Sequence, residues 1–451
     1  MTVSELYSLF LKHPVITTDS RNCPPNSLFF ALKGEKFNGH DFIRNALQAG
    51  CSYAVVDNVD MAANKKVIVV DSVLCALQQL AQIHRKNLRT PVISITGTNG
   101  KTTTKELVAA VLSQKFNVLY TLGNLNNHIG VPLTILRLTR DHEMAVIEMG
   151  ANHPGEIAKL STITCPNYGL ITNIGYAHLE GFGSLEGVLK SKGELYDYLR
   201  ITNGTVFIHR DNNFLTSIAK GINNLMYYGD LELCQKKNEP SCIGGKITNL
   251  NPCLSFTWQC ASDKNYIINT NLVGGYNLWN ALAAIAVGVY FDVPHEKINK
   301  AIEEYKPTNN RSQLLKTKYN ELIIDAYNAN PSSMRVAIEN FATISSDSKS
   351  VILGDMLELG EKSQELHAAI IKQIEGYKFE KVLLCGEQFS NVGQQYDCFP
   401  TVEKLCEYLE SKPLLSHYIL IKGSRGIQLE RIVEKLQKLS SELMSLPDPF
   451  A

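Results

Sequence analysis

The sequence predicts an α/β protein of about three domains, with a parallel sheet in the middle of the chain. A length of 451 residues suits about three domains of ordinary size. Short apolar runs alternate with helical stretches over most of the chain, which is typical of a parallel sheet with helices on both faces. Two polar, proline-containing segments, at residues 85–91 and 306–310, interrupt this rhythm and indicate linkers.

The N-terminal part, up to about residue 85, is predicted to be α/β. Met1–Phe10 has the pattern of an amphipathic helix. We expect strands at Ser27–Leu32, Tyr53–Val56 and Val67–Val70, and helices at Asp41–Gln48 and Leu74–Lys86.

The rest of the chain repeats the pattern. The middle part is predicted to have strands at Val92–Ile95, Ala145–Glu148, Tyr168–Ile174 and Thr205–Ile208, and a buried helix at Leu278–Tyr290. Alternating residues between about Asn224 and Asn271 favour an antiparallel extension. Beyond the second linker, strand-to-loop runs are expected at Leu322–Asp325, Val351–Gly354, Lys381–Gly386 and Tyr418–Gly423.

The segment Ile93-Ser-Ile-Thr-Gly-Thr-Asn-Gly-Lys-Thr-Thr-Thr-Lys-Glu106 indicates nucleotide binding. An apolar run ends in a glycine loop, and a helix-forming run follows. In such a unit backbone N–H groups face a polyphosphate, Lys101 reaches the β/γ-phosphates and the Thr102 hydroxyl can ligate Mg²⁺. Gly97 stands three residues before Gly100, where the common motif needs five, so a simple turn is the alternative. The position between strand and helix favours ATP.

Composition excludes several classes of protein. Hydrophobic residues make up 44% and charged residues 20%, as in ordinary globular proteins. Lys plus Arg equals Asp plus Glu at 44 each, so no long-range field indicates nucleic acid or a membrane surface. The N-terminus lacks the pattern of a signal peptide, and no apolar run reaches the ~18 residues of a membrane span. The eleven cysteines include no Cys-x-x-Cys pair, so we expect mostly reduced core thiols and a cytoplasmic protein.

Three polar residues are placed at the carboxyl ends of predicted strands, where ligands bind in doubly wound sheets. Glu148 could hold Mg²⁺ against the phosphates, or be solvated or cap the next helix. His178 could bind metal or phosphate, although a lone histidine is more often structural. Asp325 could accept hydrogen bonds from ribose hydroxyls.

Other polar segments have two readings each. Lys422 and Arg425 together could neutralise a carboxylate or phosphate. Lys190 and Lys192 lie in a predicted helix and read as surface charges by composition. Thr18-Asp-Ser-Arg21 flanks a short predicted strand, and Gly123-Asn-Leu-Asn-Asn-His-Ile-Gly130 is dense in amide donors that suit diphosphate or sugar hydroxyls. Each segment could equally be a turn with self-capping side chains.

Taken together, these segments resemble the Mur ligase family, whose phosphate loop, like that of folylpolyglutamate synthetases, has the short spacing of Thr96-Gly-Thr-Asn-Gly-Lys-Thr-Thr103. The resemblance runs nearly end to end and is to the branch that adds D-alanyl-D-alanine. The motifs that carry it are Asp19-Ser-Arg21, Gly123-Asn-Leu-Asn-Asn127, Glu148-Met-Gly-Ala-Asn152, Asp325-Ala-Tyr-Asn-Ala-Asn-Pro331, Asp355-Met-Leu-Glu-Leu-Gly360 and Lys422-Gly-Ser-Arg425.

The resemblance implies three domains. They would be a UDP-sugar-binding α/β domain at residues 1–88, a central P-loop ATPase with a parallel sheet at 89–306, and a Rossmann-like ligase domain at 307–451. It implies an ATP-dependent ligase in peptidoglycan precursor synthesis. The terminal carboxylate of UDP-N-acetylmuramoyl-tripeptide would become an acyl phosphate, which the amine of D-Ala-D-Ala then attacks. Partners would be these substrates, without nucleic acid or membrane insertion, and the protein is expected to be a monomer.

The resemblance also assigns residues. Lys101, His178, Lys192 and Arg311 would be catalytic. ATP would contact Gly97, Thr98, Asn99, Gly100, Lys101, Thr102, Thr103, Asn277, Arg311 and Asp325. Two Mg²⁺ ions would be held by Thr102, Glu148, His178 and Lys192, the last as N6-carboxylysine. The UDP-linked substrate would contact Asp19, Ser20, Arg21, Asn126 and Asn127. Candidates for D-Ala-D-Ala are Asn328, Asp355, Lys422 and Arg425, unranked.

Two rivals remain. One is a Mur ligase that adds a single residue, the third of the peptide. It carries an Asp-Asn-Pro-Arg motif, and here the Asp355-Met-Leu-Glu-Leu-Gly360 loop stands instead. The other is a non-catalytic ATP-binding scaffold, against which retention of Lys101, Thr102, Glu148 and His178 argues. Whether the tripeptide ends in lysine or diaminopimelate stays open, as does the domain arrangement.

Overall fold

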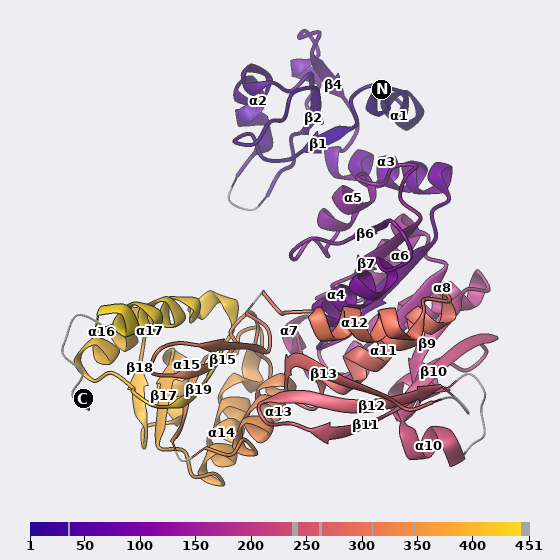
Figure 1. Ribbon diagram of the computed structural model, residues 1–451. Coiled ribbons are helices and arrows are strands. Elements are labelled where there is room, and N and C mark those ends of the chain that lie inside the picture. Colours follow the sequence, from indigo (N-terminus) through magenta and orange to yellow (C-terminus); the bar gives the residue numbers. More distant parts are fainter. Residues whose placement is uncertain (35–36, 237–241, 261–263, 309, 347, 443–451) are drawn as a thin grey trace.

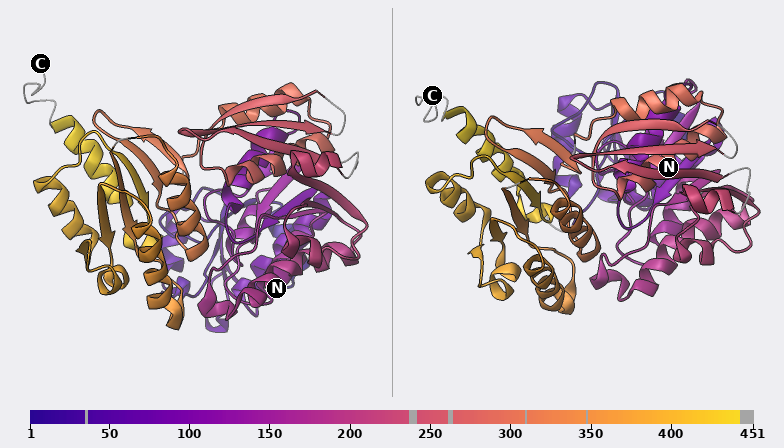
Figure 2. Two further views of the ribbon diagram at one scale, coloured as in Figure 1. Left: turned by 90° about the horizontal axis from the view of Figure 1, so that it is seen from below. Right: turned by 60° about the horizontal axis from the view of Figure 1, so that its bottom comes forward.

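The described residues of the computed structural model, 1–34, 37–236, 242–260, 264–308, 310–346 and 348–442, form three sheets that follow one another along the chain. The N-terminal sheet lies at the top of Figure 1, the central sheet below it, and the C-terminal sheet at the lower left. The two further views in Figure 2 show the C-terminal part lying beside the central one. The predicted α/β class with three sheet-containing parts is confirmed.

The N-terminal sheet has four parallel strands in the order β1-β2-β3-β4. Its elements are α1 (Val3–Phe10), β1 (Val15–Thr17), β2 (Ser27–Phe30), the 3-10 helix η1 (Gly39–Phe42), α2 (Ile43–Ala49), β3 (Tyr53–Val56), the 3-10 helix η2 (Val59–Met61) and β4 (Val67–Val69). The predicted amphipathic helix begins at a capping box, in which Thr2 and Glu5 satisfy each other's backbone amides.

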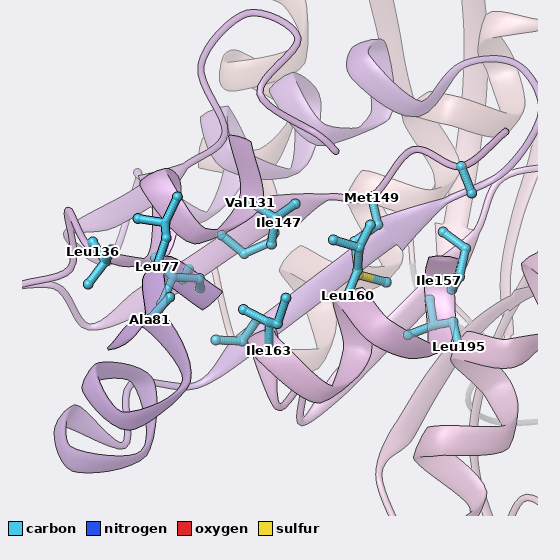
Figure 3. Close-up of a cluster of buried hydrophobic side chains, with 14 of the residues drawn as sticks. Leu77, Ala81, Val131, Leu136, Ile147, Met149, Ile157, Leu160, Ile163 and Leu195 are labelled. Atoms are coloured by element: carbon cyan, nitrogen blue, oxygen red, sulfur yellow. The ribbon is translucent and has the colours of Figure 1, made fainter. Parts of the chain in front are cut away.

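Helix α3 (Val73–Leu88) connects this sheet to the next part. Its apolar side contacts α1 as well as α5 (Gly130–Ile135) and α6 (Glu156–Thr164) of the central part. Figure 3 shows Leu77 and Ala81 of this helix in one cluster with Val131, Leu160 and Ile163 of the central part. The N-terminal and central parts therefore share one continuous hydrophobic cluster, and the predicted boundary after residue 88 stays a prediction.

The central sheet has nine strands in the order β13-β12-β11-β10-β9-β8-β5-β7-β6. Its strands are β5 (Val92–Thr96), β6 (Val118–Tyr120), β7 (Met144–Glu148), β8 (Tyr168–Ile171), β9 (Thr205–His209), β10 (Asn224–Asp230), β11 (Cys242–Asn249), β12 (Cys253–Cys260) and β13 (Tyr266–Val273). Its helices are α4 (Lys101–Leu112), α5 (Gly130–Ile135), α6 (Glu156–Thr164), α7 (Leu179–Phe182), α8 (Leu185–Ile201), α9 (Asn213–Ile218), α10 (Leu231–Lys236), α11 (Asn277–Tyr290) and α12 (His295–Glu304).

The strands from β6 to β11 are parallel, whereas β12 runs antiparallel to both of its neighbours. The antiparallel extension predicted from about Asn224 therefore begins only where β11 meets β12. Helix α11 is nearly completely buried, as predicted, and packs against α4 within the second hydrophobic cluster. Burial on this side fixes α4, and with it the phosphate loop that precedes it.

The C-terminal sheet has six strands in the order β14-β15-β19-β16-β17-β18, all parallel except β14. Its elements are β14 (Gln313–Lys316), β15 (Glu321–Asp325), α13 (Pro331–Ala342), β16 (Lys349–Gly354), the 3-10 helix η3 (Gly360–Lys362), α14 (Ser363–Glu375), β17 (Lys381–Cys385), α15 (Glu387–Val392), β18 (Asp397–Phe399), α16 (Val402–Ser411), β19 (Tyr418–Lys422), the 3-10 helix η4 (Arg425–Ile427) and α17 (Glu430–Glu442). The predicted linker 306–310 separates it from α12, and residue 309 lies outside the described residues.

The cysteines differ from the prediction. Cys234 and Cys242 form a disulfide, which the spacing of the cysteines did not predict. Of the free cysteines in the described part of the chain only Cys51 and Cys385 are buried, so most are not core thiols. No described helix is both long and apolar enough to cross a membrane.

Candidate active site

The phosphate loop joins β5 to α4 through two glycines with positive φ, Gly97 at 140° and Gly100 at 78°. A Cβ atom at Gly97 would lie 2.0 Å from the Thr172 hydroxyl, so no larger residue fits there. The Lys101 ammonium donates to the carbonyls of Gly97 and Thr98, at 2.8 and 3.0 Å. Burial lowers the pKa of Lys101 to about 8. The loop is thus a closed turn with a half-buried cation beside it.

Glu148 ends β7 beside this loop, because β7 is the parallel neighbour of β5. One carboxylate oxygen accepts a 2.8 Å bond from the Thr102 hydroxyl, and the other accepts a 2.7 Å bond from the Asn126 amide. Only 1% of Glu148 is exposed. The alternative of a solvated strand-end acid is wrong. The side chain is a buried carboxylate held between the phosphate loop and the loop after β6.

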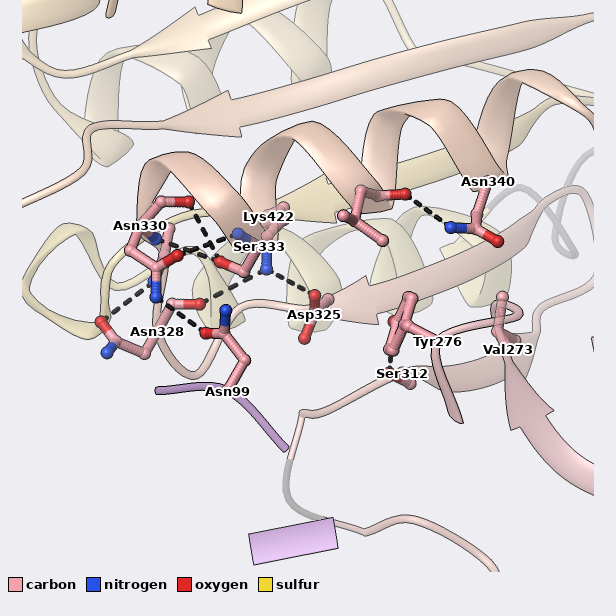
Figure 4. A network of polar contacts seen from close by, with 12 residues as sticks. Asn99, Val273, Tyr276, Ser312, Asp325, Asn328, Asn330, Ser333, Asn340 and Lys422 are labelled. Carbon is pink, nitrogen blue, oxygen red and sulfur yellow. Dashed lines mark hydrogen bonds and ion pairs between the residues drawn. The ribbon is translucent and has the colours of Figure 1, made fainter. Parts of the chain in front are cut away.

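Asparagines lock the phosphate loop to its neighbours. The Asn99 backbone N–H donates to the Asn173 side chain at 3.0 Å, and the Asn99 carbonyl accepts from Thr172 and Asn173. The Asn330 amide, at the start of α13, donates to the Asn99 side-chain oxygen at 2.8 Å. Figure 4 shows this link, by which the C-terminal part contacts the phosphate loop directly.

The start of α11 forms another wall. Asn277 is fully buried and donates to the Val273 carbonyl at 2.8 Å, while Asn280 donates to the Asn277 side chain at 2.8 Å. The Tyr276 hydroxyl is bonded to Ser312 at 2.6 Å, which ties this wall to the residue after Arg311. Asn277 lines the cavity, and its hydrogen bonds with Val273 and Asn280 orient its amide.

The C-terminal wall carries charges in fixed positions. Asp325 and Lys422 are register partners on β15 and β19, and their side chains form an ion pair of 2.5 Å. The Arg311 guanidinium lies 3.7 Å from the ring centroid of Tyr327, and its buried Nε atom has no hydrogen-bond partner among the described residues. Such a stacked, unsatisfied guanidinium is suited to an anion.

His178 occupies a left-handed turn, with φ 51°, at the start of α7. Its Nδ1 atom contacts the carboxylate of Glu358, which comes from the loop after β16 in the C-terminal part. The hydrogen bond from His178 lowers the pKa of the Glu358 carboxyl group. This contact links the central and C-terminal parts at the residue assigned to the second metal ion.

Lys192 is a buried residue, so its reading as a solvated surface lysine is wrong. It is 2% exposed on α8, donates to the Ala151 carbonyl at 3.1 Å and lies 5.1 Å from the ring centroid of Phe182. Burial, reinforced by the charge of Lys101, lowers the pKa of Lys192 to about 7. The lowered pKa favours the neutral amine. Lys190, two positions earlier, is exposed as predicted.

A cavity of about 940 Å³ lies between the central and C-terminal parts. Among the predicted site residues it is lined by Thr98, Asn99, Gly100, Lys101, Thr103, Asn126, Asn127, Glu148, His178, Asn277, Arg311, Asp325, Asn328 and Lys422. Gly97, Thr102 and Lys192 lie behind this lining, in contact with residues that belong to it. The predicted residues that follow strands of the central sheet thus meet at its carboxyl edge, as expected for parallel strands.

Other predicted site residues lie elsewhere. Asp19 and Arg21 form an exposed ion pair in the N-terminal part, with Ser20 between them, and the guanidinium lowers the pKa of Asp19 to about 2. Arg425 lines a smaller cavity of about 120 Å³, next to His178 and Glu358. The uridine assignment of residues 19–21 stays a prediction.

The structure gives Asp355 a structural role, in contrast to its assignment as a D-Ala-D-Ala candidate. Its buried carboxylate accepts hydrogen bonds from the backbone amides of Gln388 and Phe389, at 2.9 and 2.8 Å, at the start of α15. It lines neither cavity. A carboxylate occupied in this way stabilises the helix N-terminus.

Sequence reasoning did not single out several residues that line the two cavities. Glu358 was read only as part of a loop, and His209 and Trp279, whose rings lie 4.3 Å apart between centroids, were not named as site residues. The signal that could have identified Trp279 is its position two residues after Asn277, which was itself predicted to contact ATP.

The protein matches known families over most of its length. The profile described as "Mur ligase family, catalytic domain" matches residues 14–85, "Mur ligase middle domain" 95–288, and "Mur ligase, glutamate ligase domain" 310–425. A relative from Bacillus subtilis (strain 168), UDP-N-acetylmuramoyl-tripeptide–D-alanyl-D-alanine ligase, is 37% identical over 444 residues, which covers 93% of this chain and 92% of the relative. The chain belongs to the Mur ligase family. The resemblance drawn from the motifs is confirmed.

Solved Mur ligase structures share the whole architecture. Crystal structure I of MurF from Acinetobacter baumannii has a TM-score of 0.86 and 29% identity, and covers 97% of this chain and 98% of that chain. MurF ligase from Thermotoga maritima in complex with ADP has a TM-score of 0.83 and 25% identity, and covers 96% and 99%. The three-domain Mur ligase architecture is therefore that of this protein.

Proposed function

We propose that the protein joins D-Ala-D-Ala to the terminal carboxylate of UDP-N-acetylmuramoyl-tripeptide, with conversion of ATP to ADP and phosphate, in peptidoglycan precursor synthesis. The observation that carries this proposal is the cavity between the central and C-terminal parts, where the phosphate loop, Glu148 and Arg311 face one another. The names of the relatives and the ADP in the Thermotoga maritima structure support the reaction and the nucleotide.

The phosphate loop would bind the triphosphate. The loop residues and the start of α4 line the cavity, and Lys101 would exchange the carbonyls of Gly97 and Thr98 for phosphate oxygens. Asn277 would contact the adenine, Asp325 the ribose and Arg311 the γ-phosphate. Thr98, Asn99, Gly100, Thr102 and Thr103 complete the loop.

The reaction then needs two displacements at fixed positions. A carboxylate oxygen of the tripeptide bonds to the γ-phosphorus and ADP leaves. The amine nitrogen of D-Ala-D-Ala bonds to the carbonyl carbon, loses a proton, and phosphate leaves. The residues of the cavity contribute by holding anions together and by excluding water, because no covalent protein intermediate is required.

The residues fit a magnesium ion at the phosphate loop. Thr102 and Glu148 are hard oxygen donors already in contact, and among the described residues the buried carboxylate accepts side-chain hydrogen bonds from the uncharged Thr102 and Asn126. When bound there, Mg²⁺ would neutralise charge on the phosphates. Thr102 and Glu148 would hold the ion, and Asn126 would orient the carboxylate.

A second magnesium ion would need His178 together with a carbamylated Lys192. The described residues contain no group of three or more His, Cys, Asp and Glu side chains arranged for a metal. A carbamate on the buried amine would add an anionic oxygen donor on a long stem, and its formation needs the neutral amine that the lowered pKa provides.

The substrates would enter from two sides. Asn126 and Asn127 would face the muramoyl-diphosphate, and Asp19, Ser20 and Arg21 the uridine. For D-Ala-D-Ala we retain Asn328, Lys422 and Arg425, since Asp355 is occupied. We further propose domain boundaries at 88/89 and 306/307, a monomeric state and a cytoplasmic location.

One assay tests this function. Phosphate release from ATP is measured with UDP-N-acetylmuramoyl-tripeptide and either D-Ala-D-Ala or single amino acids. We expect release with the dipeptide, and the ligated product by mass spectrometry. Release only with a single amino acid would assign the protein to the third-residue-adding type, and binding of ATP without any release would make it a non-catalytic scaffold.

A further inference from the structure

A tyrosine at the start of the second linker is bonded to the helix that carries the phosphate loop. Tyr305 directly follows α12, and its half-buried hydroxyl donates a 2.6 Å hydrogen bond to a carboxylate oxygen of Glu106 on α4. Burial and the negative charge of Glu106 raise the pKa of Tyr305 far above its usual value. The hydroxyl therefore stays protonated and acts as a donor.

The bond continues inward through a buried cation. The other Glu106 oxygen accepts from the Lys105 ammonium at 3.2 Å, and Lys105 is completely buried. The same ammonium donates to the Thr121 carbonyl at 2.8 Å. A buried ammonium strongly penalises any loss of its partners, so this part of the chain has little freedom to rearrange.

The last step reaches Glu148. The Thr121 hydroxyl accepts a 3.0 Å hydrogen bond from the backbone N–H of Glu148, at the end of β7. A continuous polar chain of Tyr305, Glu106, Lys105 and Thr121 thus connects the linker to the backbone of the carboxylate that faces Thr102.

The linker is also fixed from its other side. The Asn271 amide, on β13, donates to the backbone carbonyls of Glu303 and Tyr305, at 2.7 and 3.2 Å. Arg311 follows in the same segment, and its positive charge is close enough to oppose the rise of the Tyr305 pKa. Tyr305 is therefore connected by hydrogen bonds towards Glu148 and lies within electrostatic range of Arg311, and both of these charged residues line the cavity.

We propose that Tyr305 is a positioning residue for phosphoryl transfer, which acts through Glu106, Lys105 and Thr121 on Glu148 and through the linker on Arg311. Neither the phosphates nor the acceptor would contact Tyr305. The hydroxyl keeps the Glu148 carboxylate and the Arg311 guanidinium in a fixed relative position. The catalytic part of this proposal rests on the proposed function.

The test uses Tyr305→Phe, which keeps the ring and removes only the hydroxyl. We expect kcat to fall about tenfold, since small misplacements at a reacting centre cost that order of magnitude, while the Kd for ATP changes less than about twofold. Hydrogen exchange at the Glu148 amide should become faster in the same variant. Tyr7→Phe is the matched control, because Tyr7 is also a half-buried tyrosine whose hydroxyl contacts His84, and neither residue lines the cavity.

A double-mutant cycle with Glu106→Gln checks the route. If the polar chain connects these residues, the double variant loses less kcat than the product of the fold losses in Tyr305→Phe and Glu106→Gln. The reason is that both changes break the same connection. Unchanged kcat and unchanged exchange at Glu148 in Tyr305→Phe would overturn the proposal, as would a loss of activity that only follows the loss of folded protein. A wild-type protein without ligase activity would contradict the proposed function, and the exchange measurement would still decide the connection.

Discussion

The Nδ1 atom of His178 and a carboxylate oxygen of Glu358 are in direct contact, although the two residues are 180 positions apart in the chain. His178 follows a strand of the central sheet, and Glu358 lies in a loop of the C-terminal part. Both have positive φ, at 51° and 63°, so the two tight turns present their side chains to each other. The contact occupies the histidine that we assign to the second metal ion.

Removal of this contact should loosen the arrangement of the two parts. We expect Glu358→Ala to broaden the distribution of distances between fluorescent labels on the central and C-terminal parts of the ligand-free protein. Glu361→Ala, an exposed acid in the neighbouring 3-10 helix, is the control and should leave the distribution unchanged. Identical distributions in Glu358→Ala and wild type would show that the ion pair does not hold the parts together.

Lys101→Ala should abolish turnover and leave the protein folded. Loss of a cation that stabilises transition-state charge typically costs a factor of about 10² or more in rate. Within the described part of the chain the ammonium bonds to the carbonyls of Gly97 and Thr98 in its own loop, so the melting temperature should change little. Steady-state kinetics and thermal unfolding check both parts. A large fall in melting temperature with activity retained per folded molecule would make Lys101 structural.

Lys192→Ala should be nearly inactive and partly rescued by small carboxylates such as acetate, which could replace the carbamate oxygens. Wild-type activity should also fall when bicarbonate is stripped from the buffer. Lys190→Ala is the matched control on the same helix, since its side chain is exposed. Wild-type turnover in Lys192→Ala, or a high-resolution map with both metals bound and a bare amine, would contradict carbamylation.

His209 should make the protein sensitive to acid. Burial lowers its pKa from 6.5 to about 4, despite the nearby Asp211, so the folded protein holds the ring neutral. Between these pH values the unfolded chain binds a proton that the folded one does not. Stability is therefore lost as the pH falls from 6.5 towards 4. Between pH 6.5 and 4 the melting temperature of His209→Gln should fall less than that of the wild type. The exposed His153→Gln should behave like wild type, and equal acid sensitivity of the His209 variant would assign the effect to other groups.

The local part of the site could be predicted from the sequence, because it depends on short patterns. The phosphate loop between β5 and α4 is set by an apolar run, two glycines and a helix start within a few residues. Glu148 and His178 follow from the rule that carboxyl ends of parallel strands meet at one edge. These predictions needed no knowledge of distant contacts.

The remaining parts depend on contacts between distant segments, which short patterns do not contain. The pair of Asp325 and Lys422 results from the register of β15 on β19, so two residues assigned to different ligands bond to each other. Burial of Lys192 depends on how α8 packs, and composition suggested the opposite. The occupation of Asp355 by α15 and the contact of Glu358 with His178 required the folded C-terminal part.

The walls of the cavity come from two parts of one chain, so even weak contacts between these parts can hold the walls together. A covalent tether keeps one face near the other at an effective concentration of the order of millimolar, so contacts too weak to hold separate molecules suffice. The Asn330–Asn99 hydrogen bond is such a contact. If the chain is cut at the linker, the two pieces should therefore separate and the cavity should be lost, even if both pieces keep their folds. The covalent connection, more than the affinity of the two parts, keeps the walls of the cavity together.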